Sequence, residues 1–219
     1  MQSTKEIIII IPAYNEEKTI GSVISGAKKY CNVLVVNDSS TDKTEEIAKK
    51  NGASIIRNER NMGYDTTLNR GIAEAAKSAD VVMIMDADGQ HNPDDIPKML
   101  SLIEGNKADF VIGIRPWRIR LSEKIYRRFS KWKIGVIDPL CGFKAFRADV
   151  YKKIGYYDSM RSIGTEFMFA VKRNGYRIGQ VEISLNPRVD IPRFEGGSSL
   201  KAELSIFLAM VKVMVKYSV

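Results

Sequence analysis

The sequence predicts an α/β protein in which helices cover both faces of a Rossmann-like sheet. Over the first 114 residues, short runs of β-branched and other apolar residues alternate with amphipathic segments, the pattern of βαβ units. The run at residues 80–85 is almost continuously apolar, as a strand buried on both faces requires. Beyond residue 114 this regular alternation ends, and the predicted loops are longer. With 219 residues and neither a repeat nor a linker, we expect one domain.

Each predicted element has a local signal. Strands are predicted at residues 6–11, 33–37, 54–57, 80–85 and 108–114, with later pieces at 142–147 and 176–184. Helices are predicted at residues 16–30, 44–51, from the turn at 61–63 to 77, and at 92–104, 165–174 and 200–219. Thr41 and Asp42 cap the second helix, Gly52 ends it, and Pro93 takes the first position of the fourth. Residues 186–199, with two prolines and two adjacent glycines, are expected to form a long loop.

Composition excludes several classes of protein. A chain with 44% hydrophobic and 27% charged residues can bury a core of its own, so disordered and low-complexity classes are excluded. One histidine, His91, and two distant cysteines, Cys31 and Cys141, cannot form a disulfide framework or a zinc-finger ligand set. We therefore expect a reducing compartment, and the polar N-terminus is not that of a signal peptide.

The net charge of +8 is concentrated in one segment. Residues 115–133 hold eight basic side chains against Glu123, a local balance of +7: Arg115, Arg118, Arg120, Lys124, Arg127, Arg128, Lys131 and Lys133. Such a concentration favours an anionic partner bound at one place. On charge alone, nucleic acid, lipid headgroups and a phosphorylated substrate all remain open.

The last predicted helix is amphipathic. Lys201, Ser205, Lys212 and Lys216 share one narrow face, and the rest of the helix is nearly all apolar. Its apolar stretch is shorter than the roughly 20 residues that a membrane span needs. The helix fits a place among anionic lipid headgroups, or docking on the domain or on a second copy in a homo-oligomer. We expect a cytoplasmic protein, peripheral at the cytoplasmic face of a membrane.

Two acidic residues directly follow the most apolar strand. Asp86 and Asp88 stand at its carboxyl end, and Gln90 adds a neutral oxygen nearby. In open α/β sheets ligands bind at that edge, and magnesium and manganese prefer such oxygen ligands. The alternative is an acidic turn that caps the next helix. His91 is either a base or ligand of this site or a hydrogen-bonded loop residue.

Further candidate residues follow the first two strands and lie at the same predicted edge. Residues 12–16, with the sequence PAYNE, end the first strand, and Asp38 ends the second. Together they could frame a nucleoside, with Asp38 accepting hydrogen bonds from the base and Tyr14 packing on it. Taken singly, each of these residues equally fits turn formation or helix capping.

Several motifs follow one another along the chain in a definite order. They are IPAYNEE at residues 11–17, VVNDSSTD at 35–42, NMGY at 61–64, DADGQHNP at 86–93, YRR at 126–128, DPLCGFK at 138–144, Glu166, and RFEGGS at 193–198. This ordered set resembles family 2 glycosyltransferases of the GT-A fold. Within that family it is most similar to polyprenol-phosphate glycosyltransferases of the dolichol-phosphate mannose or glucose synthase type.

The resemblance implies a GT-A fold with a mixed sheet, a catalytic domain over residues 1–200 and a C-terminal amphipathic helix over 201–219. It implies that Asp86, Asp88 and Gln90 hold Mg or Mn against a nucleotide-sugar diphosphate. The implied nucleotide-sugar contacts are Pro12, Ala13, Tyr14, Glu16, Asp38, Asp86, Ala87 and Asp88. Two departures concern the nucleotide: residues 37–40 read NDSS where the family usually has DDGS, and Asp65 replaces a usual glycine. The resemblance implies a UDP- or GDP-sugar as donor, and on the same resemblance the motifs at 61–64 and 126–128 favour UDP.

The charge pattern and the resemblance together predict the acceptor. Family members that act on a sugar hydroxyl carry an acidic pair at the start of a late helix, whereas this chain has Glu166 alone. A hydroxyl needs a base to remove its proton. A phosphate is already ionised near pH 7 and needs positively charged residues to bind it instead. We expect an inverting transfer to polyprenol or dolichol phosphate, with Arg115, Arg127, Arg128 and Arg193 binding the phosphate.

Three alternatives remain open on the sequence. Transfer to a saccharide hydroxyl would use Glu166 as base. A nucleotidyltransferase would release pyrophosphate instead of a nucleoside diphosphate. A basic nucleic-acid or membrane-binding module would use its aromatic residues to stack on single strands, the candidates being Trp117, Tyr126, Phe129 and Trp132. An acidic pair at the sheet edge would repel a phosphate backbone, so no nucleic acid is expected as a partner.

Overall fold

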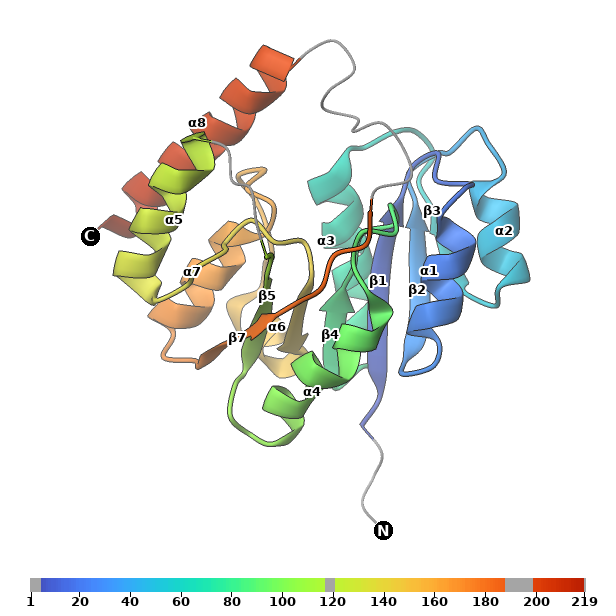
Figure 1. Cartoon of the computed structure of the whole chain (residues 1–219), viewed down its shortest axis with the longest axis horizontal. Helices are drawn as coiled ribbons and strands as arrows, with labels where there is room; N and C mark the ends of the chain where they lie inside the picture. Colours follow the sequence, from blue (N-terminus) through green and yellow to red (C-terminus); the bar gives the residue numbers. More distant parts are fainter. Residues whose placement is uncertain (1–4, 117–120, 188–198, 219) are drawn as a thin grey trace.

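The described strands form one seven-stranded sheet in the order β3-β2-β1-β4-β6-β5-β7 (Figure 1). The structure is a computed structural model that describes residues 5–116, 121–187 and 199–218. The strands are β1 (Ile7–Ala13), β2 (Asn32–Asn37), β3 (Ser54–Arg57), β4 (Val81–Ile84), β5 (Phe110–Ile114), β6 (Lys144–Arg147) and β7 (Ile178–Glu182). Most of β1 and all of β4 are buried, because helices cover both faces of the sheet.

The strand directions place the functional edge. β1 pairs in parallel with β2 and β4, and β2 with β3. β6 lies antiparallel to both β4 and β5, and β7 is parallel to β5. The expected mixed sheet is therefore confirmed. Because of these directions, the carboxyl ends of β1, β2, β4 and β5 meet at one edge, and the chain enters β6 from that same edge.

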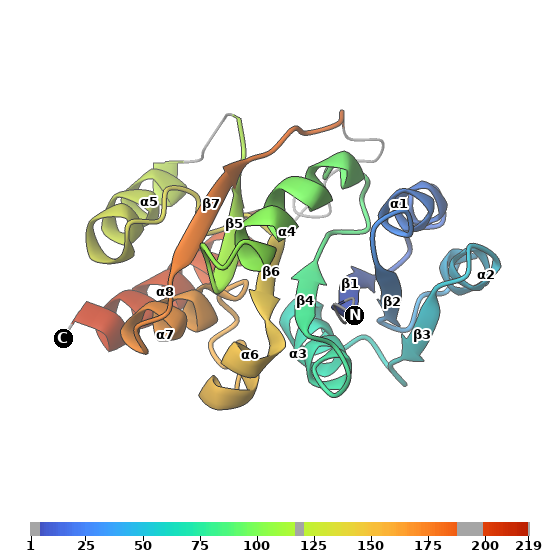
Figure 2. The same ribbon diagram turned by 90° about the horizontal axis from the view of Figure 1, so that it is seen from below.

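Helices pack against the sheet from both sides. They are α1 (Ile20–Ala27), α2 (Thr44–Lys50), α3 (Tyr64–Ala75), α4 (Ile96–Glu104), α5 (Leu121–Ile134), α6 (Ala148–Ile154), α7 (Thr165–Arg173) and α8 (Ser199–Ser218). Figure 2 shows α3 and α6 on one face of the sheet and α1 and α4 on the other. α3 contacts β1 and β2, whereas α4 contacts β5, β6 and β7.

Several elements differ from the sequence-based prediction. The helix expected at residues 92–104 starts with a 3-10 turn at Pro93–Asp95 and is α-helical only from Ile96. The helix expected at residues 16–30 begins only at Ile20, because the carbonyl of Glu16 first accepts the N–H groups of Thr19 and Ile20 in a turn. Most of the basic segment, for which the sequence analysis predicted no element, forms the helix α5. α6 was not predicted at all. It has only seven residues and ends at Gly155, which has a φ of 85°, so its amphipathic pattern is too short to recognise.

The C-terminal helix α8 docks on the domain. It contacts α5 and α7, and its residues Met210, Val213 and Tyr217 are buried. Lys216 is exposed, as Lys212 is, but its ammonium group does not point to solvent alone, because it donates to the buried carboxylate of Glu166, 2.7 Å away. The side chains of Lys201 and Ser205 lie outside the described residues. None of the described helices has the length and hydropathy that crossing a membrane requires.

The close approach of α3 to the sheet depends on Gly71. A Cβ atom added at Gly71 would lie 2.7 Å from side-chain carbons of both Ile10 and Val36. We predict that Gly71→Ala lowers the free energy of unfolding by about 1–3 kcal/mol, because the overpacked helix must shift from the sheet. Urea unfolding measures this change. The control Ala73→Ser, on the exposed side of the same helix, should stay within about 0.5 kcal/mol of the parent.

Candidate functional site

The acidic pair lies at the sheet edge where β4 ends. Asp86 follows β4 by two residues and is half-buried. Its Oδ1 atom accepts a hydrogen bond of 2.8 Å from the hydroxyl of Tyr64, the first residue of α3. Tyr64 is 36% exposed, and partial burial followed by the charge of Asp86 raises the pKa of its hydroxyl. The tyrosine therefore stays protonated and donates to the carboxylate.

The other side of Asp86 faces the loop that enters β6. A Cβ atom at Gly142 would come within 2.5 Å of the Asp86 Oδ2 atom, so a larger residue there would displace this carboxylate. His91 is buried, stacks on Phe143, and its Nδ1 atom accepts the Asp86 N–H at 3.3 Å. Of the two interpretations of His91, this geometry matches the hydrogen-bonded loop residue.

Asp88 and Gln90 form a tight turn directly after Asp86. The Gln90 N–H donates to Asp88 Oδ1 at 3.0 Å, and the Gln90 carbonyl accepts the N–H of Asn186 at 2.8 Å. Within the described ranges, no three His, Cys, Asp or Glu side chains gather closely enough to hold a metal ion. Two carboxylates fit a magnesium or manganese ion that completes its shell with substrate phosphates and water. They do not fit a cation enclosed by protein alone.

A pocket lies beside the acidic pair. Its walls come from β1, β2 and the start of α3: Pro12, Ala13, Tyr14, Asp38, Asn61, Gly63, Tyr64 and Thr67. Four residues predicted to contact the nucleoside thus lie together. Glu16 does not line this pocket, and its main chain starts the turn before α1. The sequence analysis missed Asn61, Tyr64 and Thr67 as wall residues, although the motif at 61–64 marked the segment.

Asp38 organises one wall of this pocket. It is buried, and its Oδ1 atom accepts from the side chain of Asn58 at 2.7 Å and from the N–H of Met62 at 2.8 Å. Its Oδ2 atom accepts the N–H of Gly63 at 2.9 Å. Because these donors come from the segment that leads into α3, Asp38 fixes the loop that carries Asn61 over the pocket.

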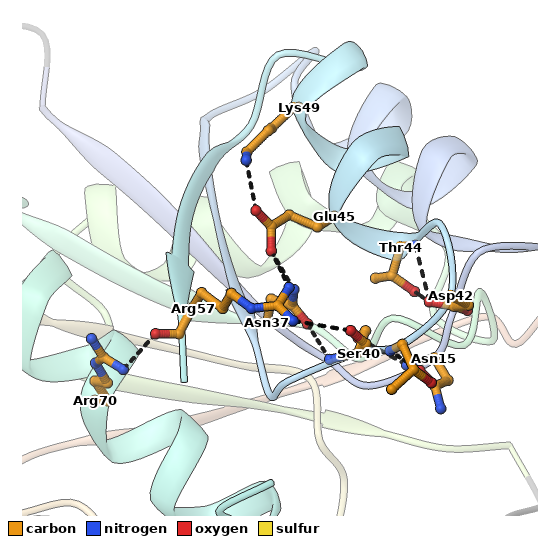
Figure 3. Close-up of polar contacts among 10 residues, drawn as sticks. Asn15, Asn37, Ser40, Asp42, Thr44, Glu45, Lys49, Arg57 and Arg70 are labelled. Carbon is orange, nitrogen blue, oxygen red and sulfur yellow. Dashed lines mark hydrogen bonds and ion pairs between the residues drawn. The ribbon is translucent and has the colours of Figure 1, made fainter. Parts of the chain in front are cut away.

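Of the residues that depart from the family motif, Asn37 has a local explanation (Figure 3). Asn37 is buried, donates to Glu45 at 2.7 Å and accepts the N–H of Ser40 at 2.9 Å. An aspartate at this position would oppose Glu45, whose pKa is lowered to about 2 by hydrogen bonds from Lys49 and Arg57. Ser39 has a φ of 64°, the left-handed conformation that favours the glycine usual in the family.

Arg115 follows β5 and is held by Asp138. Its Nε and Nη2 atoms donate to the two oxygens of Asp138 at 2.8 and 2.9 Å, a bidentate pair. Burial alone would raise the pKa of Asp138, but the guanidinium of Arg115 lowers it. Asp138 and Gly142 belong to the same loop, so this loop contacts both Arg115 and Asp86. Arg115 is thereby oriented at the edge where the acidic pair lies.

Arg127 and Arg128 line a shallow groove on α5. The other residues of the groove are Lys124, Ile125, Lys131 and Ile137. The Nε atom of Arg127 donates to the carbonyl of Ile137 at 2.6 Å. Tyr126 faces the core with 1% of its surface exposed, so it is not available for stacking on a nucleic acid. Arg193 and Trp117 lie outside the described residues.

Glu166 is completely buried at the start of α7. Its Oε2 atom accepts from the N–H of Ser159 at 2.6 Å, and the Ser159 hydroxyl contacts both carboxylate oxygens. Its Oε1 atom accepts from Lys216 of α8 at 2.7 Å. The carboxylate therefore joins α7, the preceding loop and α8, and in this arrangement it does not face solvent.

Comparison with known proteins gives the family. Residues 8–164 match the family described as glycosyl transferase family 2. Because this match covers more than half of the chain, the chain belongs to that family and is a glycosyltransferase. The glucosyl-3-phosphoglycerate synthase of Mycobacterium tuberculosis, solved with Mn²⁺, UDP and glucosyl-3-phosphoglycerate, superposes with a TM-score of 0.75. That match covers 97% of this chain and 80% of the synthase at 21% identity, which shows the shared GT-A fold.

Several relatives in sequence come from archaea. An uncharacterized protein of Methanocaldococcus jannaschii is 35% identical over 81% of this chain and 80% of its own length. The UDP-N-acetylglucosamine--dolichyl-phosphate N-acetylglucosaminyltransferase of Methanococcus voltae is 30% identical over 82% of this chain and 85% of its own length. The dolichol-phosphate mannosyltransferase of Pyrococcus furiosus is 30% identical over 90% of this chain and 60% of its own length.

The ion pair between Lys216 and Glu166 gives a stability prediction. Lys216→Met should lower the free energy of unfolding by about 1–3 kcal/mol, because it leaves a buried carboxylate without its cation. The same substitution in a Glu166→Gln background should cost much less, since no buried charge remains. Urea unfolding of the four proteins in a double-mutant cycle measures the difference.

Lys212→Met, on the exposed face of the same helix, is the matched control and should change stability little. Equal costs of Lys216→Met in the two backgrounds would contradict the assigned pairing.

Proposed function

We propose that this glycosyltransferase moves a sugar from a nucleotide-sugar, with UDP favoured over GDP, to a polyprenol phosphate. The observation that carries the choice of acceptor is the state of Glu166. Its carboxylate is buried, hydrogen-bonded by Ser159 and paired with Lys216. A sugar hydroxyl needs a base to remove its proton, whereas an ionised phosphate oxygen does not. Because the carboxylate of Glu166 is buried and paired, it is not available as a base. This favours the phosphate acceptor over a saccharide hydroxyl.

The names of two relatives support the same acceptor class. The Methanococcus voltae relative is named as a transferase to dolichyl phosphate, and the Pyrococcus furiosus relative as a dolichol-phosphate mannosyltransferase. Their names specify different donor sugars, so they do not decide the donor of this chain. What they share is a sugar acceptor that carries a phosphate on a long lipid.

The pocket and the acidic pair support a nucleotide-sugar donor. The pocket between Tyr14, Asp38 and Asn61 offers an aromatic ring and polar groups to a nucleoside. Asp86 and Asp88 lie beside it and would hold Mg or Mn, with the Gln90 side chain as a further oxygen donor. A cation there would neutralise the charge that develops on the departing diphosphate. The related synthase was solved with Mn²⁺ and UDP, a ligand pair consistent with this assignment.

The surface of α5 and α8, which lie in contact, supports a lipid acceptor. Trp132 of α5 is 75% exposed, and Leu208 and Val215 of α8 are also exposed. Basic residues line the neighbouring groove, among them Arg127 and Arg128. Exposed apolar side chains beside basic ones suit contact with an anionic lipid surface. A lipid acceptor would be reached there, with the protein peripheral to the membrane.

The proposed reaction is a single displacement. An oxygen of the acceptor phosphate bonds to the anomeric carbon on the side opposite the nucleotide. The bond from that carbon to the diphosphate oxygen breaks, the nucleoside diphosphate leaves with the electron pair, and the anomeric configuration inverts. Arg115, oriented by Asp138, together with Arg127, Arg128 and Arg193, would hold the negative charge of the acceptor. Glu166 would act as a positioning residue.

The donor site is tested by nucleotide binding. Calorimetric titration with UDP and GDP, each with and without Mn²⁺, should show UDP binding that needs the metal. Asp88→Asn should weaken this binding at least tenfold, because a neutral amide is a poor ligand for a hard cation. The control Asp94→Asn changes an exposed carboxylate at the start of the next helix and should bind as the parent does. Metal-independent binding, or binding unchanged in Asp88→Asn, would overturn the assignment.

The acceptor is tested by Glu166→Gln. If a polyprenol phosphate is the acceptor, this variant should keep kcat/KM within about tenfold of the parent, whereas loss of a general base costs about 10²–10⁴-fold. The assay follows sugar transfer to polyprenol phosphate in detergent, with UDP-glucose, UDP-N-acetylglucosamine and GDP-mannose as donors. Absence of transfer to polyprenol phosphate by the parent with every donor would contradict the phosphate acceptor. A loss of more than a hundredfold in a folded Glu166→Gln variant would contradict the view that the reaction needs no base from Glu166.

A further inference from the structure

Two carboxyl groups from distant parts of the chain meet between α3 and the loop that leads into α7. Asp65 lies in the first turn of α3, directly after Tyr64. Its Oδ1 atom accepts the N–H of Ile163, and Asp158 Oδ2 accepts the N–H groups on either side of it, those of Ser162 and Gly164. The two carboxyl groups therefore approach the same three backbone residues. Two ionised carboxylates have only acceptors and repel each other, so a proton shared by the pair would stabilise this approach.

The other partners of the two groups show which one carries the proton. Asp158 Oδ1 accepts the N–H of Met160 at 2.9 Å, and its Oδ2 accepts the N–H groups of Ser162 and Gly164, both at 2.7 Å. Asp158 thus has three backbone donors. Asp65 accepts one backbone N–H, that of Ile163, at 3.2 Å. Because it has fewer donors, Asp65 is the better place for the shared proton.

The loop that Asp65 contacts adopts an uncommon conformation. Arg161 and Ile163 both have a φ of 58°, a region that a β-branched residue such as isoleucine rarely enters. The N–H of Ile163 donates to Asp65, and its carbonyl accepts from the buried ammonium group of Lys144 at 2.8 Å. Such a conformation persists only where surrounding contacts determine it. Asp65 provides one of these contacts.

This loop lies between the donor side and the acceptor side of the enzyme. Toward the donor, α3 begins with Tyr64, which lines the pocket and contacts Asp86. Toward the other side, Ser159 in the loop donates to Glu166, which α8 also contacts. Asn69 of α3 adds two hydrogen bonds with the backbone of Asp158, of 2.7 and 3.2 Å.

We propose that Asp65 is a positioning residue for glycosyl transfer, and that the proton it shares with Asp158 holds α3 against the loop before α7. Loss of this proton places two negative charges together and loosens the contact. The link would then respond to pH while the chemistry of the reacting groups stays the same. It does not depend on which acceptor the enzyme uses.

The charges around Asp65 set the direction of this response. Burial and then the charge of Asp158 raise the pKa of Asp65 from 3.8 to about 7. Lys144 of β6 opposes this shift, and the other titratable groups that face Asp65 are the hydroxyls of Tyr64 and Tyr157. The folded protein therefore keeps a proton that the unfolded chain releases. Stability contributed by this proton is lost as the pH rises from about 4 to about 7.

The test compares the parent with Asp65→Asn, whose amide can donate to Asp158 and accept from Ile163 at every pH. The Tm of each protein is measured between about pH 5 and pH 8 by circular dichroism. The Tm advantage of the variant should grow by about 5 °C or more across this range. Asp149→Asn is the control, because Arg147 lowers the pKa of Asp149, and its curve should parallel that of the parent.

Amide hydrogen exchange locates the effect. In the parent, protection of peptides covering residues 159–166 and 61–68 should fall about tenfold or more between pH 6 and pH 8 after correction for intrinsic rates. Asp65→Asn should keep this protection. Asp65→Gly should lose it at residues 159–166 at every pH, because the acceptor for Ile163 is gone. Parallel Tm curves for the parent and Asp65→Asn, or protection that does not change with pH in the parent, would overturn the proposal.

Discussion

The antiparallel pairing of β6 with β4 is the constraint on which the candidate site depends. Because the strands run in opposite directions, the chain enters β6 from the edge where β4 ends, and Lys144 lies opposite Ile84. The loop before Lys144 is thereby brought against Asp86 through Gly142. The same loop fixes Arg115 through Asp138. The register of β6 against β4 thus fixes the positions of Asp86 and Arg115 relative to each other.

Much of the fold and the donor side of the site could be predicted from the sequence, because the signals are local. β3 has the predicted bounds, and β4 is fully buried as its continuous apolar run indicated. Parallel strands present their carboxyl ends at one edge, so Tyr14, Asp38 and Asp86 were expected near one another. The structure places Tyr14 and Asp38 on one pocket wall and Asp86 beside Tyr64 of the same pocket.

The contacts between distant segments could not be predicted, because periodicity shows which face of an element is apolar but not what covers it. Lys216 appeared to belong to a lysine stripe, yet it reaches Glu166, fifty positions earlier in the chain. Asp65 was visible only as a departure from a family motif, and its partner Asp158 carried no signal of its own. Arg115 was recognised as a basic residue, but its pairing with Asp138 depends on a loop that the sequence leaves unplaced.

The described charges are separated in space in a way that suits a transferase with two anionic substrates. Asp86 and Asp88 concentrate negative charge at the sheet edge, where a diphosphate can be held only through a cation. The positive charge lies on α5, in the groove of Arg127 and Arg128. The carboxylate of Glu166 is a further negative charge, but Lys216 of α8 pairs with it. If the acceptor is the phosphate proposed above, the docking of α8 neutralises a carboxylate that would otherwise repel it, so α8 would contribute to the electrostatics of the enzyme as well as to its packing.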